Sequence, residues 1–430
     1  MDSFLIEPFD PQQNLLSYIG RSNGPGPFAV GGEVQNWAVT VNLDLLRSLP
    51  NIIVLNLPEQ EPETLPRIRS ATRVNGGFLW TGGRERCSVL LSNMNGRFRA
   101  SISCLYGRYQ VETTNQGTRL SRIASGPAPA ATHYDSAEIG STLGSTPQCQ
   151  PAPQGSPDSQ IDVMILYTPL VTQGLQAEGI NVQQFMQDTL DETQLAMDRS
   201  TSPGEPVIAS LNLVHAQEVN RPENHDFLED LIYLTDPGIP ANLRIVHAAD
   251  LVMLIRETTP DPDQCGLANT AGLGNTPAPG PDFAPIAVGV TRRRCCPLNP
   301  PAPCYSTLPF QHEFGHLFGA NHNPENAPPP TVPKVRPYAF AHWKNNTSGG
   351  EESARTIVAY QLSECDGDCP QVLNYSNAEV TLTKPWAFHT GLANERENAR
   401  VIEEFAPVTA QYCKSLSSDV IFANGFEAGP

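Results

Sequence analysis

The 430-residue sequence predicts an α/β domain with one twisted, mixed sheet, preceded by a β-rich region. Three observations support this fold class. Residues 1–123 have a β-rich pattern, most clearly in one hairpin. From Ile161 onward, apolar strands alternate with amphipathic helices. Residues 124–158, between these parts, are rich in Pro, Ala, Ser and Gly, which indicates an exposed linker where proteases cut.

The hairpin in the first region turns at Asn95-Gly96, a strong signal for a two-residue turn. Partners across this turn have numbers that add up to 191, so Cys87 lies opposite Cys104. Counting outward from the closing pair puts both at a non-hydrogen-bonded position, where Cα atoms are ~4.5 Å apart. This separation is at the short end of disulfide geometry. We therefore predict a Cys87–Cys104 disulfide.

The second half of the chain is predicted to alternate strands with helices. The strands are expected at residues 161–167, 207–214 and 251–255, and the helices at 181–199, 237–248 and 394–405. The resulting division is a β-rich domain at 1–123, a linker at 124–158, an α/β domain at 159–413 and a tail at 414–430.

The most specific motif runs from His312 to His322 and has the form HExxHxxGxxH. On a helix, His312 and His316 lie on one face and can bind one ion. Gly319 allows a sharp turn, which brings His322 back as a third nitrogen ligand. Three protein ligands leave the fourth tetrahedral position of zinc open to water, as in catalytic sites. The motif predicts one Zn²⁺ on the three histidines, with Glu313 beside it as general base.

This motif is the metzincin signature. With the strand ending in Tyr167-Thr168-Pro169 and the order of elements, residues 160–413 resemble the bacterial reprolysin-like zinc metallopeptidases, which are related to the adamalysins. The N-terminal β region resembles the propeptides of such enzymes. Segments that match those common in the family are Trp80–Gly82, His247–Leu251, Cys265–Ala268, Pro337–Ala341 and Tyr375–Asn377.

The resemblance implies a metzincin-like fold and a secreted zinc endopeptidase, made as a zymogen and cleaved in the linker for activation. Its substrates would be peptides and proteins, and its own prodomain would be the inhibitor. It implies that Gly266, Leu267, Ala268 and Asn269 form an edge strand on which an extended peptide pairs, although the residues alone would fit an ordinary loop. It also implies that Tyr360 donates a hydrogen bond to the reaction's oxyanion; packing beneath the site is the alternative.

Two positions depart from the family pattern. Metzincins have a methionine in a turn beneath the zinc, whereas here Val358 aligns with it, and Leu373 is a competing alignment. Both residues are apolar, so we expect the site to persist with softened zinc affinity or rate. Asn323 follows the third histidine where adamalysin relatives usually have Asp, which puts a buried carboxylate contact in doubt.

The chain has ten cysteines, and this even number suits an exported protein with disulfides. The N-terminus lacks the pattern of a signal peptide, so we expect that the signal has been removed. A cytosolic enzyme with free thiols is the alternative.

Cys149, just before the α/β domain, has two interpretations. Its thiolate could fill the open zinc position, as in cysteine-switch relatives, or it could form a disulfide. Asp135 is a second candidate for blocking the zinc. Elsewhere, Cys365 and Cys369 could close a small loop, and Cys413 could tie the C-terminal helix back.

Charge and hydropathy exclude other classes. The net charge of −18 argues against a nucleic-acid partner, which needs a basic surface. No run of 18 apolar residues is present, so we expect no membrane span. The acidity would allow calcium, although no binding loop of recognised spacing occurs. We expect a monomer. The alternative function is a non-catalytic secreted binding or inhibitor protein that keeps zinc for structure.

Overall fold

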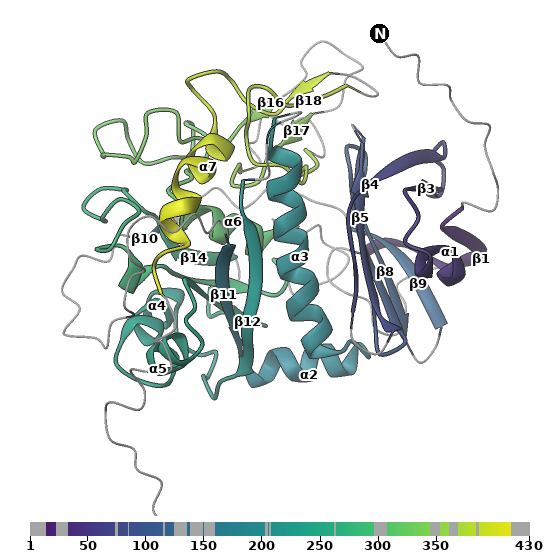
Figure 1. The fold of residues 1–430 in the computed structure, drawn as a ribbon, viewed down its shortest axis with the longest axis horizontal. Coiled ribbons are helices and arrows are strands. Elements are labelled where there is room, and N and C mark those ends of the chain that lie inside the picture. The colour runs from purple at the N-terminus through teal and green to yellow at the C-terminus, as the bar shows by residue number, and fades with distance from the viewer. Residues whose placement is uncertain are drawn as a thin grey trace, which may run out of the picture.

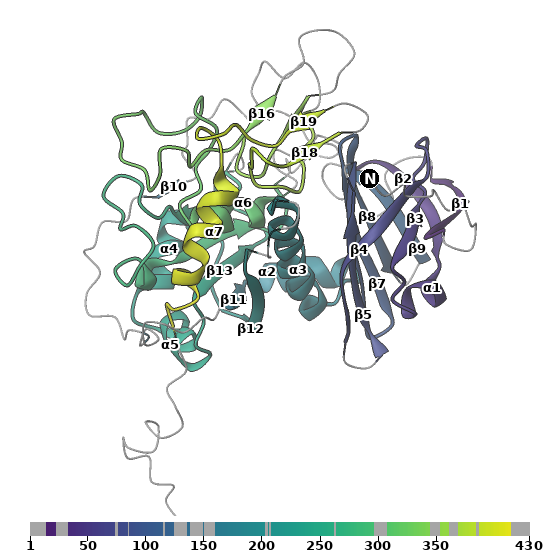
Figure 2. The ribbon, with the colours of Figure 1, turned by 45° about the horizontal axis from the view of Figure 1, so that its top comes forward.

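The computed structural model describes residues 14–22, 33–73, 76–84, 86–114, 117–123, 136–137, 149, 160–202, 205, 208–261, 264–295, 308–344, 353–360, 369–383 and 387–413. Within these ranges a nine-stranded sheet and a six-stranded sheet organise the chain. Helix α3 (Val182–Ser200) lies between them and faces the nine-stranded sheet in both views (Figures 1 and 2).

The nine-stranded sheet is antiparallel and has the order β1-β2-β9-β8-β7-β6-β5-β4-β3. Its two edges are linked, because the backbone N–H of Leu15 donates to the carbonyl of Val54 at 2.9 Å. The sheet is therefore nearly closed around its own core. Its elements are β1 (Leu16–Ser22), β2 (Glu33–Val41), α1 (Leu43–Arg47), β3 (Ile52–Leu55), β4 (Glu63–Thr72), β5 (Phe78–Gly83), β6 (Cys87–Met94), β7 (Arg97–Cys104), β8 (Gly107–Thr114) and β9 (Gly117–Ile123).

The β6–β7 hairpin follows the predicted register. Asn95 and Gly96 both have positive φ angles, 54° and 79°, as a type I′ turn requires. Cys87 lies opposite Cys104 with the Cα atoms 4.1 Å apart, and the two form a disulfide. The prediction of this bridge from the turn alone is confirmed.

The six-stranded sheet has the order β10-β14-β15-β13-β11-β12. Its pairs are parallel, apart from the antiparallel pair β14–β15. Its strands are β10 (Ser136–Ala137), β11 (Gln160–Tyr167), β12 (Ser210–Glu218), β13 (Leu251–Arg256), β14 (Gly266–Asn269) and β15 (Val288–Arg292). Short pairs β16 (Trp343–Lys344) with β17 (Ala354–Arg355), and β18 (Thr381–Leu382) with β19 (Phe388–His389), lie outside this sheet.

The helices of this half are α2 (Pro169–Ala177), α3, α4 (Phe227–Thr235), α5 (Ile239–Val246), α6 (Pro309–His316) and α7 (Asn398–Thr409), with a 3₁₀ turn at Ala284–Ile286. The predicted strands at 161–167 and 251–255 and helices at 181–199 and 237–248 are present, with small shifts at their ends. No described helix is both long enough and apolar enough to cross a bilayer.

Two predicted elements, at residues 207–214 and 394–405, have different bounds in the structure, Ser210–Glu218 and Asn398–Thr409. Strand β12 continues to Glu218, beyond the predicted end at residue 214. Helix α7 begins at Asn398 instead of residue 394, because Leu392 pairs with Arg396 and Asn394 has a φ of 59°. That local turn is incompatible with a right-handed helix at residue 394.

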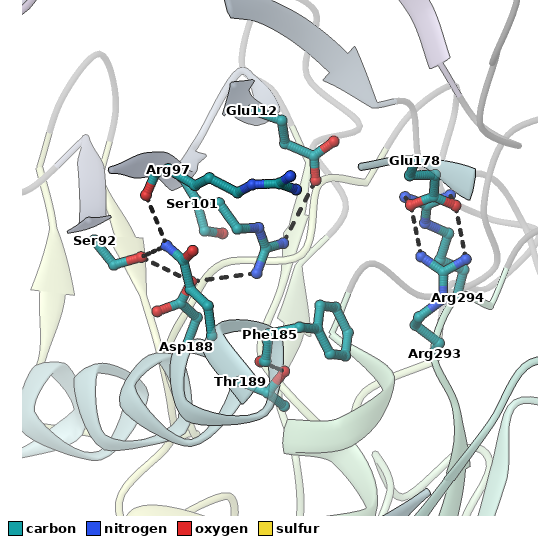
Figure 3. Close-up of polar contacts among 12 residues, drawn as sticks. Ser92, Arg97, Ser101, Glu112, Glu178, Phe185, Asp188, Thr189, Arg293 and Arg294 are labelled. Carbon is teal, nitrogen blue, oxygen red and sulfur yellow. Dashed lines mark hydrogen bonds and ion pairs between the residues drawn. The ribbon is translucent and has the colours of Figure 1, made fainter. Parts of the chain in front are cut away.

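Polar side chains join α3 to the nine-stranded sheet. The carboxylate of Asp188 accepts hydrogen bonds from Ser92 at 2.7 Å and from Arg73 and Arg99, each at 3.2 Å. Figure 3 shows Asp188 projecting from the helix toward Ser92. Further pairs are Arg73 with Asp191, Arg69 with Asp198, and Arg108 with Glu192. In these ion pairs the sheet side supplies every arginine and α3 supplies every carboxylate.

Candidate metal centre

Three histidines converge at the C-terminal end of α6. Pro309 occupies the first turn of this helix, and the helix carries His312 and His316 before it ends. Gly319 then turns the chain with a φ of 90°, and a Cβ there would come within 2.8 Å of the Ala271 carbonyl. The turn returns His322, so that the ligand atoms of the three imidazoles all lie within 4.8 Å of one another. The motif folds as its spacing predicts.

The environment of these imidazoles suits a metal. The Nδ1 of His316 lies 2.7 Å from the Ala320 carbonyl, which can only accept, so this nitrogen carries the proton. Its Nε2 is then a lone-pair donor, and it is buried without a hydrogen-bond partner among the described residues. The Nε2 atoms of His312 and His322 are 3.1 Å apart. One ion could use all three nitrogens.

Burial keeps the three rings neutral. It lowers the pKa of His316 to about 4. Burial, followed by the neighbouring His316, also holds the pKa values of His312 and His322 well below their usual range. Neutral imidazole is the form that binds metals, so no proton has to be displaced near pH 7. The donor set therefore fits the predicted zinc ion.

Glu313 lies between the helix and strand β14. Its side chain is buried, and a Cβ built on Gly266 would come within 2.5 Å of the Cγ and Oε1 atoms of Glu313. Only glycine leaves room for the carboxylate at this point of the strand. The sequence indicated both residues, but not that they touch.

Val358 and Tyr375 form the floor beneath α6. A Cβ on Gly315 would lie 3.1 Å from a methyl group of Val358 and 2.9 Å from the ring of Tyr375. Val358 is fully buried, and its φ of 71° is an outlier for a β-branched residue. The Tyr375 hydroxyl donates to the carbonyl of Gln311 at 2.8 Å. Of the two alignments for the Met-turn position, Val358 contacts the helix here, while Leu373 is buried nearby in the same core.

Asn323 connects the segment that follows the third histidine to the backbone of Tyr360. Its Oδ1 accepts from the backbone N–H of Tyr360 at 3.0 Å, and its Nδ2 donates to Asn326 at 2.8 Å. The Tyr360 ring lies 4.5 Å from the His322 ring and 5.7 Å from the His312 ring, measured between centroids. The Asn323 side chain is buried and makes these two contacts directly after the third histidine. The sequence showed Asn323 directly after His322 but gave no sign of its bond to Tyr360.

Strand β14 is not the outermost strand of its sheet. One side pairs with β15, and the other pairs in parallel with β10, in the register Ser136 to Ala268 and Ala137 to Asn269. The edge predicted at residues 266–269 is thus covered by a two-residue piece of the linker. A second disulfide, Cys265–Cys295, stands next to β14.

Of the two interpretations of Cys149, the structure contains the disulfide, which pairs it with Cys413. A sulfur bonded in this way cannot be a zinc-blocking thiolate, so the switch hypothesis for Cys149 is not supported. Cys413, which was suggested to tie the C-terminal helix back, is therefore bonded to the linker. Cys369 is also disulfide-bonded. Cys365, Asp135 and the tail at 414–430 lie outside the described residues.

Comparisons with known proteins leave the family open. No protein-family model matches the chain, and no curated protein matches it. Among solved structures, one titled "Structure of a chaperone-substrate complex" aligns with a TM-score of 0.40 and 16% identity, over 76% of this chain and 44% of that one. The crystal structure of metalloproteinase-II from Bacteroides fragilis aligns with a TM-score of 0.34 and 10% identity, over 63% and 81%. This chain spans less than half of the first structure, and likenesses of this strength carry no argument.

Proposed function

We propose that this protein is a zinc-dependent endopeptidase that hydrolyses peptide bonds of proteins. The observation that carries the proposal is that Glu313, next to His312 on α6, is buried against the backbone of Gly266, while three neutral histidines converge at the end of the same helix. His312, His316 and His322 would hold the ion. When bound, Zn²⁺ would supply a Lewis-acid charge that polarises a carbonyl and makes water a stronger acid.

Glu313 would act as general base and then general acid. Its carboxylate would take a proton from the attacking water and deliver it to the leaving amine. The Gly266 backbone fixes the carboxylate from one side, and α6 holds it from the other. Such fixation keeps a proton acceptor in reach of the reacting atoms without loss of entropy at the reaction step.

Strand β14 would orient the substrate. An extended peptide pairs with an open strand edge through its backbone, so binding by Gly266–Asn269 would be tolerant of side chains. Tyr360, beside the rings of His312 and His322, would donate to the oxyanion. Val358 and Tyr375 would support the helix from below.

The chain would be a secreted zymogen. β10 of the linker covers the edge of β14, which supports inhibition by the uncut chain, and ion pairs hold the nine-stranded sheet of residues 1–123 on α3. The disulfides support an oxidising compartment. The proposal also includes a metzincin-like architecture, a monomeric state and calcium as a further ion.

The test is the substitution Glu313→Gln. It should keep one zinc per chain, measured by atomic absorption, and lower casein hydrolysis by the linker-cleaved protein at least about 100-fold. The matched control is Glu379→Gln at an exposed carboxylate, which should retain full activity. Normal cleavage by Glu313→Gln would overturn the assignment.

The alternative, a non-catalytic zinc-containing binding or inhibitor protein, gives a different result. Linker-cleaved wild-type protein would then bind zinc without any chelator-sensitive hydrolysis. The presence of Glu313 beside the histidines favours the enzyme.

A further inference from the structure

We propose that the Cys149–Cys413 disulfide decides which linker cut can free strand β14. This inference rests on the proposed zymogen. The two cysteines are 264 residues apart in sequence, and one lies in the linker while the other follows α7. The bridge is therefore a covalent connection between the linker and the α/β domain, additional to the peptide chain itself.

The Cys413 end of this tether is firmly anchored. Cys413 is buried, and its backbone N–H donates to the carboxylate of Asp250 at 2.9 Å. The other oxygen of Asp250 accepts from the backbone N–H of Asp162 in β11 at 2.9 Å. Cys149 is thus attached to the centre of the six-stranded sheet, whatever happens to the peptide bonds between residues 150 and 159.

The order of elements along the chain then fixes the product of each cut. The nine-stranded sheet ends at Ile123, β10 spans Ser136–Ala137, the bridged Cys149 follows, and β11 starts at Gln160. A cut between 150 and 159 severs the peptide chain, but the sheet and β10 stay bound through the disulfide. Such a cut alone cannot release the inhibitor.

A cut between 124 and 135 has the opposite effect. The nine-stranded sheet loses its covalent link, whereas β10 stays tethered near β14 through Cys149. A short tether keeps β10 at a local concentration of roughly millimolar, so it competes with substrate for the strand edge. Only a cut between 138 and 148 detaches the sheet and β10 together. What then holds them are non-covalent contacts, among them the ion pairs on α3 and the two-residue pairing on β14.

Reduction opens a second route after a cut on the C-terminal side of Cys149. A dithiol would supply two electrons and two protons, its sulfurs would form a disulfide, and the Cys149–Cys413 bond would break into two thiols. The sheet and β10 would then be free to leave. In an oxidising compartment this route is closed, so the position of the cut relative to Cys149 controls release.

Three full-length variants test this, each with the same specific protease recognition sequence centred at residue 129, 143 or 154, all in the Glu313→Gln background to prevent self-cleavage. On non-reducing denaturing gels, cutting at 129 or 143 should separate the fragments. Cutting at 154 should leave one covalent species until dithiothreitol is added. The control is Cys149→Ser with Cys413→Ser, in which the cut at 154 should separate the fragments without reductant. Separation at 154 with both cysteines present would overturn the proposal.

Hydrogen exchange of a peptide covering Gly266–Asn269 reports the edge itself. After removal of the released N-terminal fragment, exchange should accelerate at least about tenfold for the cut at 143, and stay near the uncut rate for the cuts at 129 and 154. Equal acceleration after cuts at 129 and 143 would overturn it. Neither readout needs zinc or hydrolysis. If all three cuts behave as expected and the same cuts on a wild-type Glu313 background hydrolyse nothing, the proposed function fails while the tether stands.

Discussion

The two sheets differ in how far apart in the sequence their paired strands lie. In the nine-stranded sheet, the run from β3 to β9 pairs strands that follow each other in the chain, so each pair is formed by a local hairpin. In the six-stranded sheet, β10 from the linker is next to β14, and β11 is between β12 and β13. The cluster inside the nine-stranded sheet contains residues of the first region alone, whereas the larger cluster of the second region also includes Leu90 of β6. The N-terminal region is thus a local structure, while the site region depends on contacts between distant segments.

The regions also differ in what they bring to their interface. The sheet presents arginines, and α3 presents carboxylates that are mostly buried. Buried ion pairs contribute little to net stability, but losing one partner is costly because it strands the other charge. Removal of a single charged side chain should therefore weaken this interface strongly. A substitution at this interface is therefore the first test of whether the two regions can unfold separately.

The largest expected effect is that of Asp188→Ala. This substitution leaves the guanidinium groups of Arg73 and Arg99 without their shared acceptor in a buried place, at a cost of about 3–5 kcal/mol to docking of the sheet on α3. Urea unfolding followed by hydrogen exchange should show the two regions unfolding separately. Asp44→Ala, at an exposed ion pair within α1, is the control and should change nothing. A single transition at the wild-type midpoint would contradict the prediction.

The second effect is confined to the N-terminal region. Replacing Cys87 and Cys104 by Ala removes a cross-link across 17 residues and should lower the stability of the nine-stranded sheet by about 3 kcal/mol. Amide exchange in β6 and β7 should accelerate, while β11 and β13 keep their rates. The matched pair is Cys265→Ala with Cys295→Ala, which should accelerate β14 and β15 instead. Equal effects on both sheets would show that they unfold as one unit.

The features that the sequence predicted correctly are those set by contacts within a short segment. The hairpin register and its disulfide were predictable because a two-residue turn fixes every pair outward from Asn95-Gly96. The histidine set was predictable because helix geometry and one glycine place all three rings. Both inferences use only spacing along a short segment.

What was missed depends on contacts between distant segments. The pairing of β10 with β14 involves two residues, too few for any periodicity to reveal. The cysteine count allowed Cys149 to be bridged but could not choose Cys413. The contact of Gly266 with Glu313 joins residues 47 apart on different elements. The helix at 181–199 was predicted from its amphipathic pattern, which does not show that its carboxylates pair with arginines of the sheet.

The third prediction tests that missed contact at the site. Gly266→Ala would put a Cβ about 2.5 Å from the Glu313 side chain and force the carboxylate to move. A displacement of this kind should reduce kcat by about 100-fold, with both sheets and the zinc content unchanged. The control is Gly280→Ala, where a Cβ meets nothing closer than 3.8 Å. Full activity of Gly266→Ala would mean that Glu313 does not need its present position.

The smallest effect is a pH dependence of stability that arises from a histidine of the second region. All nine histidines follow residue 124, so the nine-stranded sheet contains no imidazole for mild acid to protonate. His342 is buried with its ring against Phe388, at a centroid distance of 5.8 Å, and burial lowers its pKa to about 4, with Arg396 contributing. Because this pKa lies below the unfolded value, the stabilising contribution is complete above pH 6.5 and is lost as the pH falls toward 4.

The substitution His342→Phe isolates that contribution. Between pH 6.5 and 5.5 the wild-type protein should lose about 1 kcal/mol more unfolding free energy than the variant, because only the wild-type unfolded state takes up the proton at this position. The backbone N–H of His342 keeps its bond to Thr356 in both proteins, so the difference reports the ring alone. Urea titrations at the two pH values measure it, and the exchange rates of the nine-stranded sheet should be the same in both proteins. Parallel pH profiles for wild type and variant would mean that His342 titrates in the folded protein as it does in the unfolded chain.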